Sequence, residues 1–89
     1  MKTESTWGIF KNHINSKNIG DVVSRQELRL ITDCYSNHTD YIRNICEKTG
    51  YLEKFKRNGK IISGIFVVRK HFSENLSVSA LRKEYDNRT

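Results

Sequence analysis

This chain of 89 residues contains no proline, and it has only two cysteines and five glycines. Without proline, no helix or strand is broken from within by a missing backbone N–H. The cysteines, Cys34 and Cys46, do not form a CxxC pair. Long apolar runs are also missing, since the longest, residues 64–68, is far too short to cross a bilayer.

The N-terminal residues 1–6 lack the apolar core of a signal peptide. We therefore expect the protein in the cytoplasm of a bacterial or infected host cell, with no membrane partner. In that reducing compartment the two cysteines are expected to be small buried apolar residues. A zinc site that combines them with His38 and His71 is the alternative, but the spacing matches no zinc finger. No metal and no cofactor are expected.

Catalytic motifs are missing as well. The sequence has no Gly-rich phosphate loop, no Ser-His-Asp combination and no pair of carboxylates with a convincing shared site. Its three histidines are scattered along the chain. The sequence therefore predicts a protein that is not an enzyme.

The composition, with 36% hydrophobic and 29% charged residues, is that of a soluble globular protein. The length suggests one domain over residues 1–89 with a small core. Residues 1–5 and 86–89 are expected to be flexible ends.

Positive charge is concentrated in one part of the sequence. Residues 43–70 include eight basic and two acidic residues, and this excess of six equals the net charge of +6 of the whole chain. The remaining residues include eight of each sign. A clustered basic patch is typical of proteins that bind a phosphate backbone. The alternative is a solvated basic surface that only keeps the protein soluble.

Apolar residues at spacings of three and four predict helices over residues 6–16, 24–31 and 76–85. Each of these helices has a residue suited to its N-cap: Thr6, Ser24 and Ser77. Ser24 and Glu27 also match the capping-box pattern. Residues 22–23, both valine, are a short β-branched segment. Leu28 should face the core and Leu30 should be partly buried. The last helix either packs against the first or serves a dimer partner.

A further helix is predicted between Thr39, which is suited to an N-cap, and Gly50, which is suited to a left-handed C-terminal position. Asp40 and Lys48 complement the helix dipole at its two ends. Four residues at spacings of three and four are expected to form the buried stripe of this helix: Ile42, Ile45, Cys46 and Thr49. The opposite, solvated face is expected to hold Asp40, Arg43, Asn44 and Glu47.

A basic hairpin is predicted directly after this helix. Asn58-Gly59 is the strongest short-range hairpin signal, because both residues tolerate positive φ. The first strand follows Gly50, and the returning strand is expected over residues 61–70, which are rich in β-branched and aromatic residues. Gly64 interrupts this second strand and suggests a bulge.

The helix followed by a basic hairpin resembles the winged helix-turn-helix superfamily, including the small winged-helix proteins of phages and mobile elements. The resemblance covers residues 21–70 and rests on three runs: residues 24–28 (SRQEL), residues 39–46 (TDYIRNIC) and residues 50–54 (GYLEK). It implies an α+β fold with three helices, a two- to three-stranded antiparallel wing and a C-terminal helix, with residues 22–23 as a minor strand that pairs with the edge of the hairpin. It also implies that the third helix enters the major groove of double-stranded DNA while the wing reaches the adjacent backbone.

The resemblance predicts a DNA-binding protein, with a role in transcription regulation of the phage or mobile-element type. The candidate nucleic-acid-binding residues are Asn37, His38, Tyr41, Arg43, Asn44, Glu47, Lys48, Lys54, Lys56, Arg57 and Lys60. Arg43 would bond guanine and Asn44 adenine, although Arg43 could instead pair only with Glu47. The acidic residues Asp40 and Glu47 on the same face count against DNA. The alternative function is a protein-interaction module that binds and modulates a host protein, and a homodimer is a further possible assembly.

Overall fold

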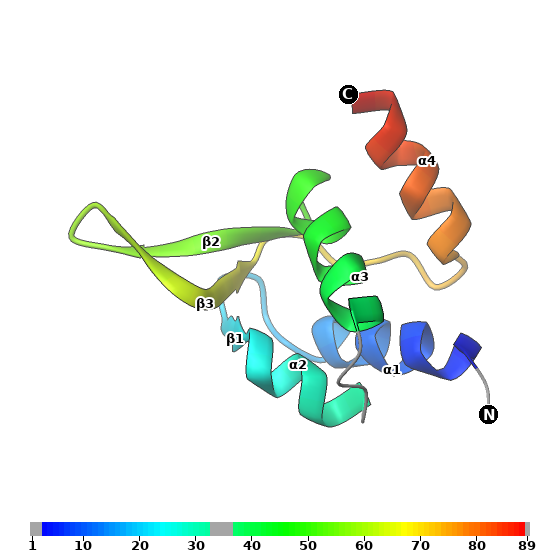
Figure 1. The fold of residues 1–89 in the computed structure, drawn as a ribbon, viewed down its shortest axis with the longest axis horizontal. Coiled ribbons are helices and arrows are strands. Elements are labelled where there is room, and N and C mark those ends of the chain that lie inside the picture. The colour runs from blue at the N-terminus through cyan, green and yellow to red at the C-terminus, as the bar shows by residue number, and fades with distance from the viewer. Residues whose placement is uncertain (1–2, 33–36, 89) are drawn as a thin grey trace.

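The computed structural model describes residues 3–32 and 37–88. Within these residues the chain forms four helices and three strands: α1 (Thr3–Asn15), β1 (Val22–Ser24), α2 (Arg25–Thr32), α3 (Asn37–Lys48), β2 (Leu52–Arg57), β3 (Lys60–Val68) and α4 (Val78–Arg88). The strands form one antiparallel sheet in the order β1-β3-β2. The protein is therefore a small α+β domain. The helices gather at one end of the molecule, and the β2–β3 hairpin projects away from them (Figure 1).

The core lies where α1, α2, α3 and α4 meet the base of the sheet. Its buried side chains come from every element: Trp7, Phe10, Ile14, Val23, Leu28, Ile42, Ile45, Cys46, Tyr51, Leu52, Phe66, Val68, Phe72 and Leu81. Phe72, in the segment between β3 and α4, packs against the rings of Trp7 and Tyr51. No described helix has the length and apolar composition that crossing a bilayer requires.

The ends of the first and last helices differ from the sequence prediction. α1 begins at Thr3 rather than at Thr6, because residues 3–5 contain no glycine or proline that would stop the helix. Thr6 therefore lies inside α1 and is not its N-cap. α4 continues to Arg88, into the stretch expected to be a tail, and residues 1–2 and 89 lie outside the described structure.

The predicted start of α2 is confirmed. The N–H of Glu27 donates to the Ser24 hydroxyl at 2.9 Å, and the N–H of Ser24 donates to the Glu27 carboxylate at 3.3 Å, which completes the capping box. The minor strand β1 is also confirmed, and it pairs with β3 from Ser24 opposite Ile65 to Val22 opposite Val67. Leu30, however, is 57% exposed, because the short α2 turns it away from the core.

The start of α3 corrects a second N-cap prediction. The helix begins at Asn37, and Thr39 is buried within it. The Thr39 hydroxyl shares a hydrogen bond of 3.0 Å with the hydroxyl of Thr32 at the end of α2. Thr32 also donates to the Leu28 carbonyl, so both hydroxyl groups have partners without water. Thr39 therefore links α2 to α3 instead of capping α3.

The buried stripe and the end of α3 are as predicted. The four residues of the stripe are all buried: Ile42, Ile45, Cys46 and Thr49. Gly50 has φ +92°, the N–H of Tyr51 donates to the Cys46 carbonyl, and the N–H of Gly50 donates to that of Glu47. This is a Schellman motif, and it turns the chain from α3 directly into β2.

The hairpin turn is also confirmed. Asn58 and Gly59 have φ values of 53° and 81°, as a two-residue type I′ turn requires. The pairing of β2 with β3 shifts register between Lys54 and Lys56, opposite the part of β3 that contains Gly64 with φ +80°. The irregularity expected at Gly64 is therefore present. β3 ends at Val68, so the predicted strand was two residues too long.

The closing helix α4 packs mainly against α3, whereas the sequence had suggested packing against the first helix or a dimer partner. Ser77 is its N-cap, since the N–H of Ala80 donates to the Ser77 hydroxyl at 3.1 Å. Leu81 is fully buried, and Tyr85 packs at the edge of the core. The hydroxyl of Tyr51 donates to Glu84 at 3.4 Å. The C-terminal helix is thus part of the folded domain.

Candidate nucleic-acid interface

The polar residues of α3 separate into two stripes. The outer stripe consists of Tyr41, Asn44 and Lys48, which are exposed to solvent. The inner stripe consists of Asp40, Arg43 and Glu47, which face α2 and the hairpin and are partly buried. The sequence placed Asp40, Arg43, Asn44 and Glu47 together on one solvated face, and this grouping is wrong. Only Asn44 of these four is exposed.

The carboxylate of Asp40 is neutralised from α2. Arg29 donates to it from both Nε, at 3.2 Å, and Nη2. The hydrogen bonds from Arg29 hold the pKa of Asp40 below its usual range, and the same bonds raise the pKa of Arg29. The pair removes the local repulsion that Asp40 would otherwise exert on an anionic ligand.

Glu47 is neutralised by two cations. Its carboxylate lies 3.3 Å from Nη1 of Arg43, one turn earlier in α3, and 3.3 Å from Nζ of Lys54 in β2. The side chains of Arg43 and Glu47 are each only 13% exposed. The guanidinium of Arg43 lies 4.8 Å above the ring of Phe66. Arg43 therefore pairs with Glu47, which the sequence offered as the alternative to a contact with guanine.

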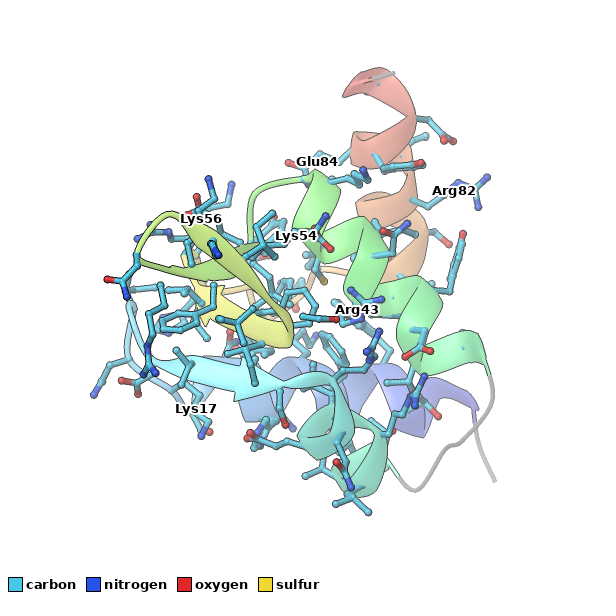
Figure 2. The ribbon with its side chains drawn as sticks, turned by 60° about the vertical axis from the view of Figure 1, so that its left-hand side comes forward. Lys17, Arg43, Lys54, Lys56, Arg82 and Glu84 are labelled. Carbon is cyan, nitrogen blue, oxygen red and sulfur yellow. The ribbon has the colours of Figure 1, made fainter. Side chains whose placement is uncertain are left out.

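The hairpin presents cations of a different kind. Lys56, Arg57 and Lys60 surround its turn and are exposed, and no carboxylate of the described residues lies within ion-pair distance of them. Figure 2 shows Lys56 on the projecting hairpin, with Lys54 and Arg43 closer to α3. The basic residues near the turn are thus available to an external anion.

The candidate residues at the start of α3 lie on its other side, near α4. The ring of Tyr41 stacks on that of His38, with centroids 6.5 Å apart, and the Tyr41 hydroxyl accepts a hydrogen bond from Arg82 of α4. In Figure 2, Arg82 lies across α3 from Lys54. The side chain of Asn37 is outside the described structure. The predicted site residues whose side chains are described therefore form two groups, with Asn44 between them. His38 and Tyr41 lie near α4, and the remaining residues lie toward the hairpin: Arg43, Glu47, Lys48, Lys54, Lys56, Arg57 and Lys60.

An open cleft of about 340 Å³ separates α3 from the hairpin. Asn44 and Lys48 of α3, Lys54 of β2 and Arg25 of α2 are among its lining residues. Five of the predicted residues line it: Arg43, Asn44, Glu47, Lys48 and Lys54. Its polar side chains are suited to bind an anion, and Glu47 is the single acidic residue among those that line it.

Arg25 also lines this cleft, although the sequence did not identify it as a candidate nucleic-acid-binding residue. Its guanidinium reaches from α2 to β3, where it lies 3.5 Å from the position that a Cβ on Gly64 would take. No described carboxylate lies within ion-pair distance of it. The sequence did contain a signal, because Arg25 directly follows the capping residue Ser24 and shares the exposed face of α2 with Arg29.

The cysteine and histidine residues do not assemble a metal site in the described part of the chain. No group of three or more His, Cys, Asp or Glu side chains there is arranged to hold a metal ion. His71 Nε2 lies 2.7 Å from the carbonyl of Lys17. Cys46 is buried as predicted, and burial raises the pKa of its thiol, so it behaves as a small apolar residue. Cys34 lies outside the described residues.

Comparison with known proteins found no match: no protein-family profile, no curated protein and no solved structure corresponds to this chain.

Proposed function

We propose that this protein is a winged helix-turn-helix protein that binds double-stranded DNA. Three features of the α+β domain support the winged-helix interpretation. The elements follow the order helix, strand, helix, helix, hairpin. The minor strand β1 pairs with β3 and so extends the hairpin into a three-stranded sheet. The hairpin follows α3 through a turn of only three residues and projects beside it.

The observation that carries the proposal is the separation of paired and unpaired charges. Both acidic residues of the inner stripe are neutralised inside the molecule, Asp40 by Arg29 and Glu47 by Arg43 and Lys54. The exposed cations Lys48, Lys56, Arg57 and Lys60 are left to face solvent around the hairpin and the end of α3. A surface with several unpaired cations and compensated carboxylates favours a polyanion.

In this proposal the candidate residues have different roles. Asn44, exposed in the middle of the outer stripe, is the residue best placed to contact a base edge. Lys48 and the cations of the hairpin are placed to contact phosphates, which position the protein without reading sequence. Arg43 and Glu47 support the interface from beneath, since their side chains are paired and largely buried.

The test is a titration of a labelled DNA duplex at several salt concentrations. Replacing Lys56, Arg57 and Lys60 together with alanine should weaken binding and reduce the magnitude of the log-log salt slope by about 2.7, at about 0.9 for each lost phosphate contact. These residues lie around an exposed turn, so the melting temperature should stay within the range of ordinary surface substitutions.

The matched control compares two single variants, Lys56→Ala on the hairpin and Lys83→Ala on α4. Both remove one exposed lysine, so they change the net charge equally. Only Lys56→Ala should change the slope. Equal effects of the two variants would show that binding follows net charge alone, and the hairpin would then have no special role.

A further inference from the structure

The hairpin has a partly open edge next to α2. On the side of β3 that faces away from β2, β1 pairs only with Ile65, Phe66 and Val67. The preceding part of β3, residues 60–64, has no strand beside it on this edge in the described part of the chain. The reason is local, because the chain leaves β1 at Ser24 and enters α2 directly. An open edge offers unpaired backbone N–H and C=O groups to another extended segment.

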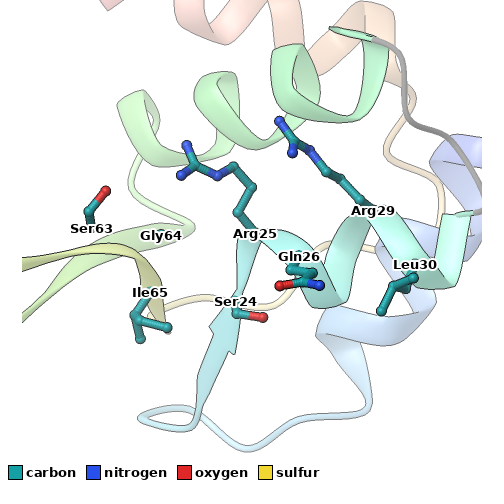
Figure 3. A pocket seen from close by; sticks show the side chains of 8 residues that line it. All are labelled: Ser24, Arg25, Gln26, Arg29, Leu30, Ser63, Gly64 and Ile65. Atoms are coloured by element: carbon teal, nitrogen blue, oxygen red, sulfur yellow. The ribbon is translucent and has the colours of Figure 1, made fainter.

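A cleft of about 460 Å³ lies at this open edge. Its lining includes Arg25, Arg29 and Leu30 from α2 and Ser63, Gly64 and Ile65 from β3. Figure 3 shows that Arg25 and Arg29 extend toward α3, whereas Leu30 and Ile65 point the other way. The cleft therefore has a basic side and an apolar side, with the strand edge between them.

On each side of the cleft, one side chain is left uncovered or without a carboxylate partner by the described residues. Leu30 is 57% exposed, which leaves a large apolar side chain in water. The guanidinium of Arg25 lies over Gly64 with no described carboxylate within ion-pair distance, although Arg29 is occupied by Asp40. A strand added to the edge would project alternate side chains to the two sides. It would match the cleft if it carried carboxylates on one side and apolar residues on the other.

We propose that this cleft binds an extended, acidic segment of a partner protein, which adds to the open edge of β3 in line with β1. Its backbone pairs with residues 60–63, its apolar side chains cover Leu30 and Ile65, and a carboxylate meets Arg25. Strand addition of this kind takes affinity from the main chain and specificity from alternate side chains. This site would give the protein a second ligand, distinct from the duplex.

Charge and chemistry select this occupant over two others. A second copy of this chain would bring another net charge of +6, and its hairpin would meet like charges. A nucleic-acid backbone would satisfy Arg25, but it has no N–H and C=O ladder for the strand edge and nothing to cover Leu30. An acidic peptide with alternating apolar residues satisfies all three features.

The probe is a short fluorescent peptide of alternating glutamate and valine. It should bind, as measured by fluorescence anisotropy, whereas a lysine–valine counterpart should not. A third peptide has the glutamate–valine sequence with every second backbone nitrogen methylated, which blocks pairing and leaves the charge unchanged. This third peptide should lose most of the affinity. Amide NMR shifts caused by the first peptide should concentrate on residues 60–63 and Arg25.

Two matched variants locate the contact. Arg25→Gln should weaken the glutamate–valine peptide about tenfold, the effect of losing one charge-assisted hydrogen bond. Lys83→Gln, which removes an exposed lysine on α4, should leave the peptide affinity unchanged. Leu30→Ser should also weaken binding, and since Leu30 is exposed, circular dichroism should show an unaltered fold for this variant.

The proposal is overturned if the methylated peptide binds as well as its parent, because binding would then be electrostatic only. Equal affinity for Arg25→Gln and Lys83→Gln would also overturn it, as would amide shifts on α4 instead of β3. Self-association that occupies residues 60–63 before peptide is added would assign the edge to a second copy. A labelled duplex is titrated separately, so a protein that binds DNA but not the peptide refutes this inference alone.

Discussion

The inner stripe of α3 and the turn of the hairpin are both rich in charge, yet their charged side chains differ in exposure to solvent and in pairing. Arg43 and Glu47 are 13% exposed, paired with each other, and backed by Phe66 and Lys54. Arg57 and Lys60 stand opposite each other across the turn, exposed and without a described carboxylate within ion-pair distance. The first region stabilises the fold, and the second is available to a ligand.

This difference shows that the net charge of a segment does not reveal which charges are available. Residues 43–70 have an excess of six positive charges, but Arg43, Lys54 and Arg69 are paired with Glu47 or Glu53. Removing one partner of a buried guanidinium–carboxylate pair leaves an uncompensated charge and destabilises the fold, whereas an exposed guanidinium contributes to long-range attraction. Matched substitutions in the two regions should therefore have opposite consequences.

The largest expected effect comes from placing a new carboxylate in the buried stripe of α3 and, for comparison, in the hairpin. Ile45→Asp would bury an unpaired charge in the stripe of α3 that faces the core, where Ile45 is 2% exposed. It should cost more than about 4 kcal/mol and unfold the domain. Ile61→Asp, at a hairpin residue that is 54% exposed, should cost no more than about 1 kcal/mol. Thermal melting by circular dichroism measures both, and a normal melting curve for Ile45→Asp would mean that the face of α3 is assigned wrongly.

The next effect compares two arginines. Arg43→Ala removes one of the two cations beside Glu47 and the cover of Phe66, and it should destabilise the domain by about 2 kcal/mol. Arg57→Ala should change stability by less than about 0.5 kcal/mol while weakening duplex binding. Urea unfolding and a duplex titration on both variants give the four values. If Arg43→Ala were as stable as the wild type, the contrast between the regions would be lost.

Two glycines test the backbone of the hairpin against that of a helix. Gly59→Ala places a side chain at φ +81° in the type I′ turn and should cost about 1 kcal/mol. Gly8→Ala in α1 meets no atom within 4 Å of its new Cβ and should stabilise the domain by about 1 kcal/mol. Amide hydrogen exchange should show faster opening of residues 52–68 only for Gly59→Ala. Identical exchange in both variants would mean that the turn conformation is not required.

The smallest effect is a pH dependence that belongs to the inner stripe. The pKa of Asp40 is held below its usual range by Arg29, so this pair contributes stability above about pH 4 that is lost as the pH falls through the lowered pKa. The pair is partly exposed, so the contribution is about 0.5 kcal/mol. The stability of Asp40→Asn should therefore decline less steeply in acid than that of the wild type. Parallel urea titrations from neutral pH downward would detect this, and identical slopes would argue against the pair.

Features decided by a few neighbouring residues could be predicted from the sequence. The capping box of Ser24 and Glu27, the type I′ turn at Asn58-Gly59 and the C-terminal Gly50 of α3 all depend on local backbone chemistry. The buried stripe of α3 followed from helical periodicity. The pairing of β1 with β3 was predicted only because the order of elements resembled a known superfamily.

Features decided by distant residues could not be predicted. Thr39 looked like an N-cap, but its hydroxyl has a partner on α2, seven residues away, and the helix begins earlier. The inner stripe looked solvated because the sequence does not show that Arg29 and Lys54 approach it from other elements. Arg25 was overlooked for the same reason, since its position over Gly64 depends on how α2 meets β3.

The connection between α3 and β2 has a consequence for recognition. Only residues 49–51 separate the two elements, and their backbone is tied by the hydrogen bonds of the turn at Gly50 and by the N–H groups of Arg69 and Lys70, which both donate to the Tyr51 carbonyl. The angle between α3 and the hairpin is consequently fixed when the protein folds. Binding then requires no further ordering of these two elements. In the proposed complex with a duplex, a ligand that spans both elements must already have the correct width, so the protein should bind B-form and A-form helices of identical charge with different affinities.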